Sequence, residues 1–424
     1  MEMGKNSQQM ESLRSRESKY IDTQPLYQNY WLQKLGGDQG KLRKDCSVLD
    51  TTLSLAGLVS SSILNSSSSQ LSPKDSSFTF WREIPEVKAS GVLASITAQE
   101  CTLQEAMFEV ITSEASYLRS LTVAVNHFSK CRELLDTLTP TEVHTLFSNL
   151  LGVREASERF LLELEDRLEE KVLVTNIGDI VLKHCAAFRK VYVPYVTNQM
   201  YQESMMQQLV GNEKFTQVLR ELEANSMCQR QPLKSFLILP FQRITRLKIL
   251  LENILTLSSP KSSMSECARS AVGAIGEIVS ECDKNVKKMK QIEDLVYLEK
   301  RLEFPKTKSL PLISQTRWLV KEGELKEIFV QEPGATTTSL HLHLFNDLLL
   351  LSRKRAEGTF SVVDYAKPSK VKAICFQTKS LVFVLQLSEN HEGNIKRMIL
   401  GADNQCELQD WVTAISTPGV TPTC

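Results

Sequence analysis

The 424-residue sequence lacks the usual marks of a secreted or membrane-embedded protein. Its first residues are polar and offer no signal-peptide core, and no apolar run approaches the ~20 residues that a membrane span needs. The ten cysteines are scattered, without a C-x-x-C pair or zinc-type spacing to histidine, so we expect reduced thiols. These absences predict a cytoplasmic protein whose recruitment to the plasma membrane, where it occurs, is peripheral.

Neither sign of charge is in excess, because 50 Lys and Arg balance 50 Asp and Glu. A nucleic-acid-binding surface is therefore not expected. Catalytic signatures are also missing: there is no G-x-x-x-x-G-K loop, no G-x-S-x-G elbow and no H-E-x-x-H pair. His341 and His343 point to one face of an expected strand, but no Cys or third His is near them in sequence. We expect no covalent chemistry, no cofactor and no metal.

What is present changes along the chain. An aromatic cluster, PLYQNYW (25–31), stands in polar surroundings and is followed by a serine-rich stretch, which is typical of a flexible linker. Five segments are predicted: a regulatory N-terminal segment at 1–44, a linker at 45–79, a helical domain with its approach segment at 80–304, a β domain at 305–418 and a tail at 419–424.

Residues 99–304 are poor in glycine and carry apolar residues at helical spacing. The pattern predicts helices over 103–128, 140–168, 176–190, 203–223, 232–257 and 266–303. The last would be roughly 55 Å long at 1.5 Å per residue, long enough to cross a whole domain. We therefore predict an elongated all-α bundle.

Near Pro305 the period of the apolar pattern shortens to two. Three leucines at 340, 342 and 344 alternate with histidines, which is typical of a half-buried strand. Strand-like runs follow at 348–352, 371–376, 381–387 and 396–400. The helical pattern at 404–415 then places one apolar face on Leu408, Trp411, Val412 and Ile415. This order predicts a small antiparallel β-barrel capped by a C-terminal helix.

Three helical segments, 103–121, 233–255 and 277–295, together resemble the Dbl-homology domain of Rho exchange factors in order and spacing. The segment LHLFNDLLLLSRK (342–354) and Trp411 resemble a pleckstrin-homology domain. The approach sequence WREIPEVKASGVL and the cluster LYQNYW are similar to the ephexin-like subgroup. That subgroup commonly carries a Src-homology 3 domain after the barrel, and this sequence ends at Cys424 without one.

The resemblance implies a guanine-nucleotide exchange factor for a Rho-family GTPase, with RhoA favoured. Such a protein binds the nucleotide-free GTPase better than its nucleotide-bound forms and makes or breaks no covalent bond. Two alternatives stay open. One is a catalytically weak scaffold that binds a GTPase or receptor, and the other is a peripheral membrane adaptor that acts through the barrel.

Five residues are predicted to bind the GTPase. Glu109 lies about 100° round the helix from the core position Val110 and should be exposed, whereas Glu114 lies near the buried stripe and should be structural. The family's matching Glu binds switch I. A polar stripe on one helix face, just after Pro240, comprises Gln242, Arg243 and Arg246. The resemblance places Arg246 where the family often has a Lys that meets switch II.

Asp283 is the fifth candidate, with Asn285 as the alternative register. The family usually has Asn at this position, and an Asp lacks the donors of the amide. The departure favours weaker exchange, although a carboxylate still accepts a hydrogen bond from an Arg of the GTPase.

The subgroup also implies autoinhibition. A segment similar to LYQNYW covers the GTPase-binding face, and a tyrosine matching Tyr27 is the switch for a tyrosine kinase. Tyr27 and Tyr30 are therefore the predicted regulatory sites. In the barrel, a set of basic residues predicts at most weak contact with anionic lipid: Arg353, Lys354, Arg355, Lys367, Lys370 and Lys372.

Overall fold

The computed structural model describes residues 18–31, 80–331, 334–355, 358–375 and 381–417. It divides into two compact units, Met1–Val286 and Lys287–Cys424. The division falls inside the helix α13, earlier than the predicted boundary between 304 and 305. Among the described residues, none of the helices has the length and apolar character that crossing a bilayer requires.

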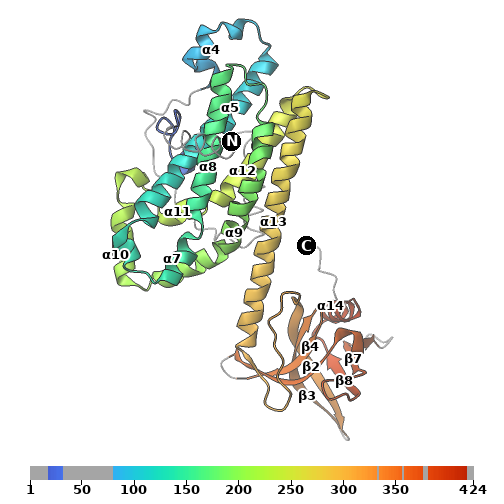
Figure 1. Cartoon of the computed structure of the whole chain (residues 1–424). Helices are drawn as coiled ribbons and strands as arrows, with labels where there is room; N and C mark the ends of the chain where they lie inside the picture. Colours follow the sequence, from blue (N-terminus) through green and yellow to red (C-terminus); the bar gives the residue numbers. More distant parts are fainter. Residues whose placement is uncertain (1–17, 32–79, 332–333, 356–357, 376–380, 418–424) are drawn as a thin grey trace, which may run out of the picture. The chain divides into compact units, whose positions relative to one another are not determined.

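The first unit is helical, as predicted. Its long helices lie side by side (Figure 1), with α5 packed against α8 and α12, and α9 packed against α8, α7 and α12. The helices are α4 (Pro85–Ala89), α5 (Ala98–Val123), α6 (Arg132–Leu135), α7 (Pro140–Phe147), α8 (Leu150–Glu170), α9 (Gly178–Leu209), α10 (Glu213–Glu223), α11 (Leu233–Leu237), α12 (Leu239–Leu257) and α13 (Ser263–Glu299).

Local sequence explains where these helices begin and end. Thr97 and Glu100 form a capping box at the start of α5, which satisfies two backbone amides that lack helical partners. The predicted helix at 140–168 is interrupted at Ser148, whose φ of 47° cannot continue a helix. Pro240 stands in the first turn of α12, where its missing N–H removes no helical hydrogen bond.

Another boundary also differs from the prediction. The segments 176–190 and 203–223 were expected as separate helices, but α9 runs unbroken from Gly178 to Leu209, with Pro194 inside it. Proline costs a helical hydrogen bond there, and buried Tyr192 and Tyr195 on either side pack into the core and offset that cost. Tertiary packing thus overrides the local breaker.

The second unit is an eight-stranded sheet with a helix at its C-terminal end. The strands follow one another in the order β1-β5-β4-β3-β2-β8-β7-β6, so the ladder through the described residues is an open sheet and not the closed barrel that the sequence predicted. The elements are β1 (Leu302–Glu303), β2 (Leu319–Gln331), β3 (Gly334–Phe345), β4 (Leu349–Lys354), β5 (Phe360–Ala366), β6 (Val371–Cys375), β7 (Val382–Leu387), β8 (Lys396–Gly401) and α14 (Gln405–Ser416).

The capping helix α14 is confirmed. Asn404 caps it by accepting a hydrogen bond from the Glu407 amide, and Leu408, Trp411 and Ile415 are buried in the core of the sheet. A Cβ on Gly323 would lie 3.2 Å from the Trp411 ring, so a glycine in β2 lets the indole approach the sheet closely.

The alternating strand β3 is buried more deeply than predicted. Leu340, Leu342 and Leu344 enter the core beneath α14, as expected. The histidines on the opposite face are not directed to solvent, because His343 is fully buried beside Phe360. Phe360 belongs to a second small core on that face, which also contains Leu295, Leu298, Leu312, Phe345 and Leu348.

Candidate functional site

The described N-terminal segment, residues 18–31, lies against α5 and α12, the two helices that carry most of the predicted site. Its residues 27–31 form a short helix. Leu26 and Tyr27 are 0% exposed, and Tyr30 is nearly as buried. These side chains join the hydrophobic core of the first unit. The aromatic cluster is therefore a packed part of the fold.

Arg246 of α12 lies beneath two aromatic rings of this segment. Its guanidinium carbon is 4.5 Å from the centre of the Trp31 ring and 5.4 Å from that of Tyr27. Both distances are within the range of cation–π attraction. Arg246 is half-buried as a result, so the segment covers one of the residues predicted to meet a GTPase.

Tyr30 reaches the surroundings of Glu109. Its hydroxyl forms a 2.9 Å hydrogen bond with the Thr112 hydroxyl, one turn along α5 from Glu109. Burial raises the pKa of Tyr30 well above its usual range, and the negative charge of Glu109 adds to the rise. Glu109 is half-buried, not exposed as predicted, because the segment lies over this part of α5.

Hydrogen bonds fix the segment along α5. The Ser116 hydroxyl donates to the Pro25 carbonyl at 2.7 Å, and the Tyr27 amide donates to the Ser120 hydroxyl at 2.8 Å. Arg119 donates to the Gln24 carbonyl. Two serines and one Arg, within about one turn of α5, thus bind the backbone of the segment and set its register.

A second set of contacts anchors the far side of the short helix. The Gln28 amide donates to the Ser235 hydroxyl at 3.2 Å. Asn29 donates to Gln229 at 2.6 Å and accepts from Gln231 at 3.2 Å. The segment therefore bridges α5 and the loop that precedes α11.

The start of the segment is held by α8. The Ser18 hydroxyl donates to Glu165 at 2.5 Å, and the Tyr20 ring packs edge-on against Phe108, with centroids 5.6 Å apart. Burial, followed by the charge of Glu165, raises the pKa of Tyr20 to about 12. Nothing in the sequence pattern at 18–24 predicted this docking.

Arg243, predicted to be a GTPase-binding residue on an exposed stripe, is buried, and its assignment to that surface is corrected here. It is 1% exposed and pairs with Glu114, 2% exposed, with 2.7 Å between its Nε and the carboxylate. Burial opposes its charge, but Glu114 outweighs that effect and keeps the pKa of Arg243 raised. The prediction that Glu114 is structural is confirmed.

The helical spacing of the neighbouring leucines indicates a buried position at Arg243, although its side chain is charged. Arg243 precedes Leu247 by four residues and Leu250 by seven, and both leucines are buried, so these positions lie on one helix face. The Ser113 and Ser157 hydroxyls complete the network by bonding Arg243 and Glu114 respectively. The result is a buried charge pair with satisfied partners.

We expect Arg243→Ala to lower the free energy of unfolding by about 3–5 kcal/mol, because it leaves Glu114 as an unpaired buried charge. Urea unfolding of the full chain, followed by circular dichroism, measures the loss. Lys248→Ala is the matched control: this residue lies on the same helix in a partly exposed ion pair with Glu252 and should cost under ~1 kcal/mol. Equal losses in the two variants would contradict the assignment.

The remaining predicted site residues lie on the surface of the first unit. Gln242 is half-buried on α12, and Asp283 is exposed on α13. Asn285, the alternative to Asp283, is partly buried. The N-terminal segment lies beside Glu109 and over Arg246. Binding of a GTPase by these two residues, Gln242 and Asp283 stays a prediction.

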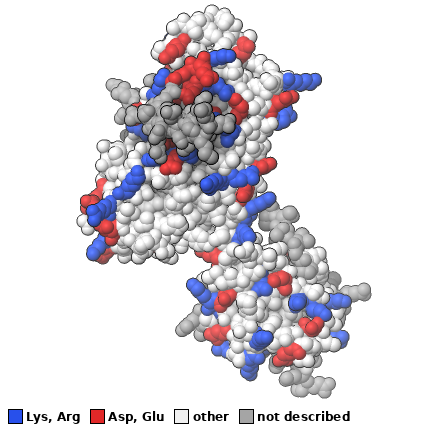
Figure 2. Space-filling view, viewed as in Figure 1, with Lys and Arg blue, Asp and Glu red and all other residues white. Residues whose placement is uncertain are grey.

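The basic residues of the sheet unit are partly neutralised. Arg353 pairs with Glu327 at 3.1 Å, and Lys370 with Glu389 at 2.8 Å. Figure 2 shows basic and acidic side chains interspersed on the visible face of this unit. A surface with such mixed charges is expected to attract anionic lipid only weakly.

Comparison with known proteins agrees with this fold. A family model described as the RhoGEF domain matches residues 106–283, which span α5 to α13. The chain is 43% identical over 414 residues to Rho guanine nucleotide exchange factor 5 of Mus musculus, covering 95% of this chain and 26% of that protein. It is 40% identical over 357 residues to Ephexin-1 of Homo sapiens, covering 82% of this chain and 50% of that protein. The chain thus spans half or less of these relatives.

Solved structures show the same tandem fold. The DH/PH domains of p115-RhoGEF match with a TM-score of 0.67 and 21% identity, over 81% of this chain and 99% of that one. The PDZ-RhoGEF DH/PH domains, solved with GTP-gamma-S-activated RhoA, match with a TM-score of 0.66 and 22% identity, over 79% of this chain and 98% of that one.

The helical unit therefore contains a RhoGEF domain, and the sheet unit has the fold of a pleckstrin-homology domain. The chain thus contains a RhoGEF domain and is similar to Rho guanine nucleotide exchange factors over most of its length. The relatives similar in sequence include ephexin-1 and exchange factors 5, 15 and 16, in agreement with the ephexin-like resemblance of the sequence.

Proposed function

We propose that this chain promotes release of GDP from a Rho-family GTPase, with RhoA as the favoured substrate, and that residues 18–31 hold it in an inhibited state. The proposal has two parts that can fail separately. A RhoGEF domain and a DH/PH fold support the exchange activity. The packing of the N-terminal segment supports the inhibition.

Exchange needs a surface that binds the nucleotide-free GTPase better than the nucleotide-bound form, because only differential affinity shifts the equilibrium. Glu109 supplies a carboxylate for switch I, and Arg246, Gln242 and Asp283 supply polar groups for switch II. The proposed exchange mechanism is therefore non-covalent and needs no catalytic pocket.

The inhibition rests on a single observation. The segment places Trp31 over Arg246 and Tyr30 beside Glu109, which are the two residues that the family resemblance assigns to the two switch regions. A GTPase and the segment cannot use these side chains at once. The segment is also part of the same chain, so even a weak contact competes well, since tethering raises the local concentration to about millimolar.

The proposal extends to the cellular setting. We expect a cytoplasmic protein, recruited peripherally to the plasma membrane, with a tyrosine kinase or an activated receptor acting upstream on Tyr27 or Tyr30. Contact between the sheet unit and anionic lipid is expected to be weak, because its basic residues are interspersed with carboxylates.

We expect the chain without residues 1–44 to release a fluorescent guanine nucleotide from RhoA several-fold faster than the full chain at equal concentration. Removing residues 1–17 alone leaves the described contacts in place, so this matched deletion should stay repressed. The measurement is nucleotide release from a panel of Rho-family GTPases.

The two parts of the proposal give different failures. If the 1–44 deletion releases nucleotide from no member of the panel but still binds one of them, the chain is a scaffold and the exchange activity is wrong. If the full chain and the 1–44 deletion release nucleotide equally fast, the exchange activity stands and the inhibition is wrong.

A further inference from the structure

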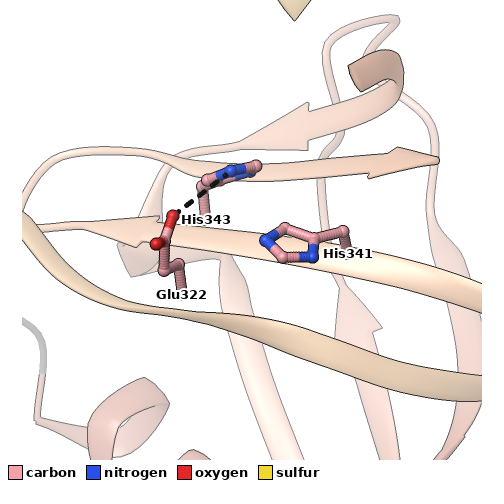
Figure 3. A group of neighbouring side chains, drawn as sticks. All are labelled: Glu322, His341 and His343. Carbon is pink, nitrogen blue, oxygen red and sulfur yellow. Dashed lines mark ion pairs between the residues drawn. The ribbon is translucent and has the colours of Figure 1, made fainter. Parts of the chain in front are cut away.

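Three potential metal ligands meet on one face of the sheet unit. His341 and His343 are two residues apart on β3 and so point to the same face. Glu322 of β2 is the register partner of His343. One ligand atom from each of the three lies within 4.8 Å of the others, and Figure 3 shows the two imidazole rings and the carboxylate directed toward a common space.

The two imidazoles have unmet hydrogen-bonding capacity. All four ring nitrogens are buried and have no hydrogen-bond partner among the described residues. The nearest charged contact of His343 is the Glu322 carboxylate, 3.6 Å from its Nε2. Buried polar atoms without partners are rare and costly, at about 1–3 kcal/mol each. Both rings pack against Phe360, with centroids 4.7 and 4.9 Å away, and this contact positions them but bonds no nitrogen.

We propose that Glu322, His341 and His343 form a binding site for a divalent late first-row metal ion, of which Zn²⁺ is the best match. Two imidazole nitrogens and one carboxylate oxygen are a ligand set that Zn²⁺ accepts in proteins, with a fourth position left to water. Binding would use two of the buried nitrogens that now lack partners. It would also cross-link β2 to β3.

The charges that surround the three side chains are mixed. Arg301 and Lys354 oppose a cation, whereas Glu322 and Glu324 on the facing strand attract one.

The ligands also have room to adjust to a metal. The side chain of Glu322 is 54% exposed, while that of His343 is 0% exposed, so a cation can enter from the carboxylate side. Metal coordination at about 2.0–2.1 Å requires the three groups to close from their present separations. Glu322 is half-exposed, so its carboxylate can rotate toward the two rings.

The experiment uses the metal-stripped full chain, titrated with Zn²⁺ against a chromogenic indicator. We expect one tight equivalent in the wild type, and a more than ~100-fold weaker affinity in Glu322→Gln, His341→Gln and His343→Gln, beyond the 10–100-fold that losing an outer partner costs. Glu322→Gln alters a half-exposed side chain and keeps the proposal testable if a buried variant misfolds. The matched controls are Glu389→Gln, an exposed carboxylate of the same unit, and His144→Gln, an exposed histidine of α7; neither should weaken binding.

X-ray absorption at the zinc edge identifies the ligands. Coordination by nitrogen and oxygen at about 2.0–2.1 Å supports the site, whereas sulfur at about 2.3 Å would mean that cysteines hold the metal and would overturn the proposal. Unchanged affinity in a folded Glu322→Gln protein would overturn it too, as would failure of the wild type to bind an equivalent of Zn²⁺. None of these outcomes depends on exchange activity.

Discussion

Glu109→Ala, made in the chain that lacks residues 1–44, should lose ~100-fold or more of its exchange rate on RhoA while keeping its helicity and thermal stability. The expected size follows from the cost of removing one partner of a desolvated charge pair at an interface, about 2–5 kcal/mol, where each 1.4 kcal/mol is tenfold. The deletion is needed because Glu109 is partly covered in the full chain.

Two further variants separate charge from packing. Glu109→Gln keeps the size of the side chain, so a rate as low as that of Glu109→Ala would assign the effect to the carboxylate. Glu155→Ala removes an exposed carboxylate from α8 and should change neither rate nor stability, since surface substitutions usually stay within ~0.5 kcal/mol. A folded Glu109→Ala protein that exchanges as fast as its parent would rule out the residue.

Much of the fold could be predicted from the sequence because its elements have strong local signals. The apolar stripe of α5, the alternation along β3 and the face of α14 each fix one element by period alone. Their order along the chain then gave a helical domain followed by a capped sheet. The sequence could not show that the sheet stays open, because whether the edge strands β1 and β6 pair with each other depends on non-local geometry.

The site was harder to predict, for a physical reason that Arg243 illustrates. A charged residue at a position where apolar residues recur is either exposed or paired with a buried partner. The partner of Arg243 is Glu114, which is separated from it in sequence by most of the helical domain. We predicted an exposed Arg243, whereas in the structure this residue is buried in an ion pair with Glu114. Glu322 poses the same problem: its proximity to His343 is set by strand register and leaves no trace near the histidines in sequence.

The N-terminal aromatic cluster was easier to predict than the site and harder to predict than the fold. Its aromatic composition and the one-turn spacing of Tyr27, Tyr30 and Trp31 predicted a helix with one apolar face, and residues 27–31 are helical. The side chains that receive it, such as Ser116 and Ser120, have no pattern that marks them as a docking surface. The predicted linker at 45–79 lies outside the described residues.

Phosphorylation of Tyr27 should open the inhibited state, and the surroundings of its ring explain why. The residue is 0% exposed, with the rings of Tyr117 and Trp31 at 5.4 and 6.0 Å. A phosphate adds about −1.5 to −2 charges and a hydrated group, for which this packed site has no room. Arg243, the buried cation beside the ring, is already held by Glu114. The phosphorylated ring must therefore leave, and the rest of the short helix with it.

The same geometry separates three variants of the full chain. We expect Tyr27→Glu to raise basal exchange several-fold, to the level of the 1–44 deletion, because it places a carboxylate in the buried ring site. Tyr27→Phe should stay repressed, since the Tyr27 hydroxyl has no hydrogen-bond partner among the described residues, and it should no longer respond to a Src-type kinase. Tyr30→Phe loses the 2.9 Å bond to Thr112 and should release inhibition only slightly, because a neutral hydrogen bond contributes about 1 kcal/mol.

Burial of Tyr27 also limits how fast a kinase can reach it, which gives a kinetic test of the same switch. A fully buried tyrosine reaches a kinase only when the segment opens, so Trp31→Ala, which removes the ring stacked on Arg246, should speed both phosphorylation of Tyr27 and basal exchange. Mass spectrometry of Tyr27 over time, with nucleotide release measured on the same samples, checks both rates. Stoichiometrically phosphorylated chain that stays repressed would contradict the mechanism and indicate that Arg246 retains the phosphate in the closed state.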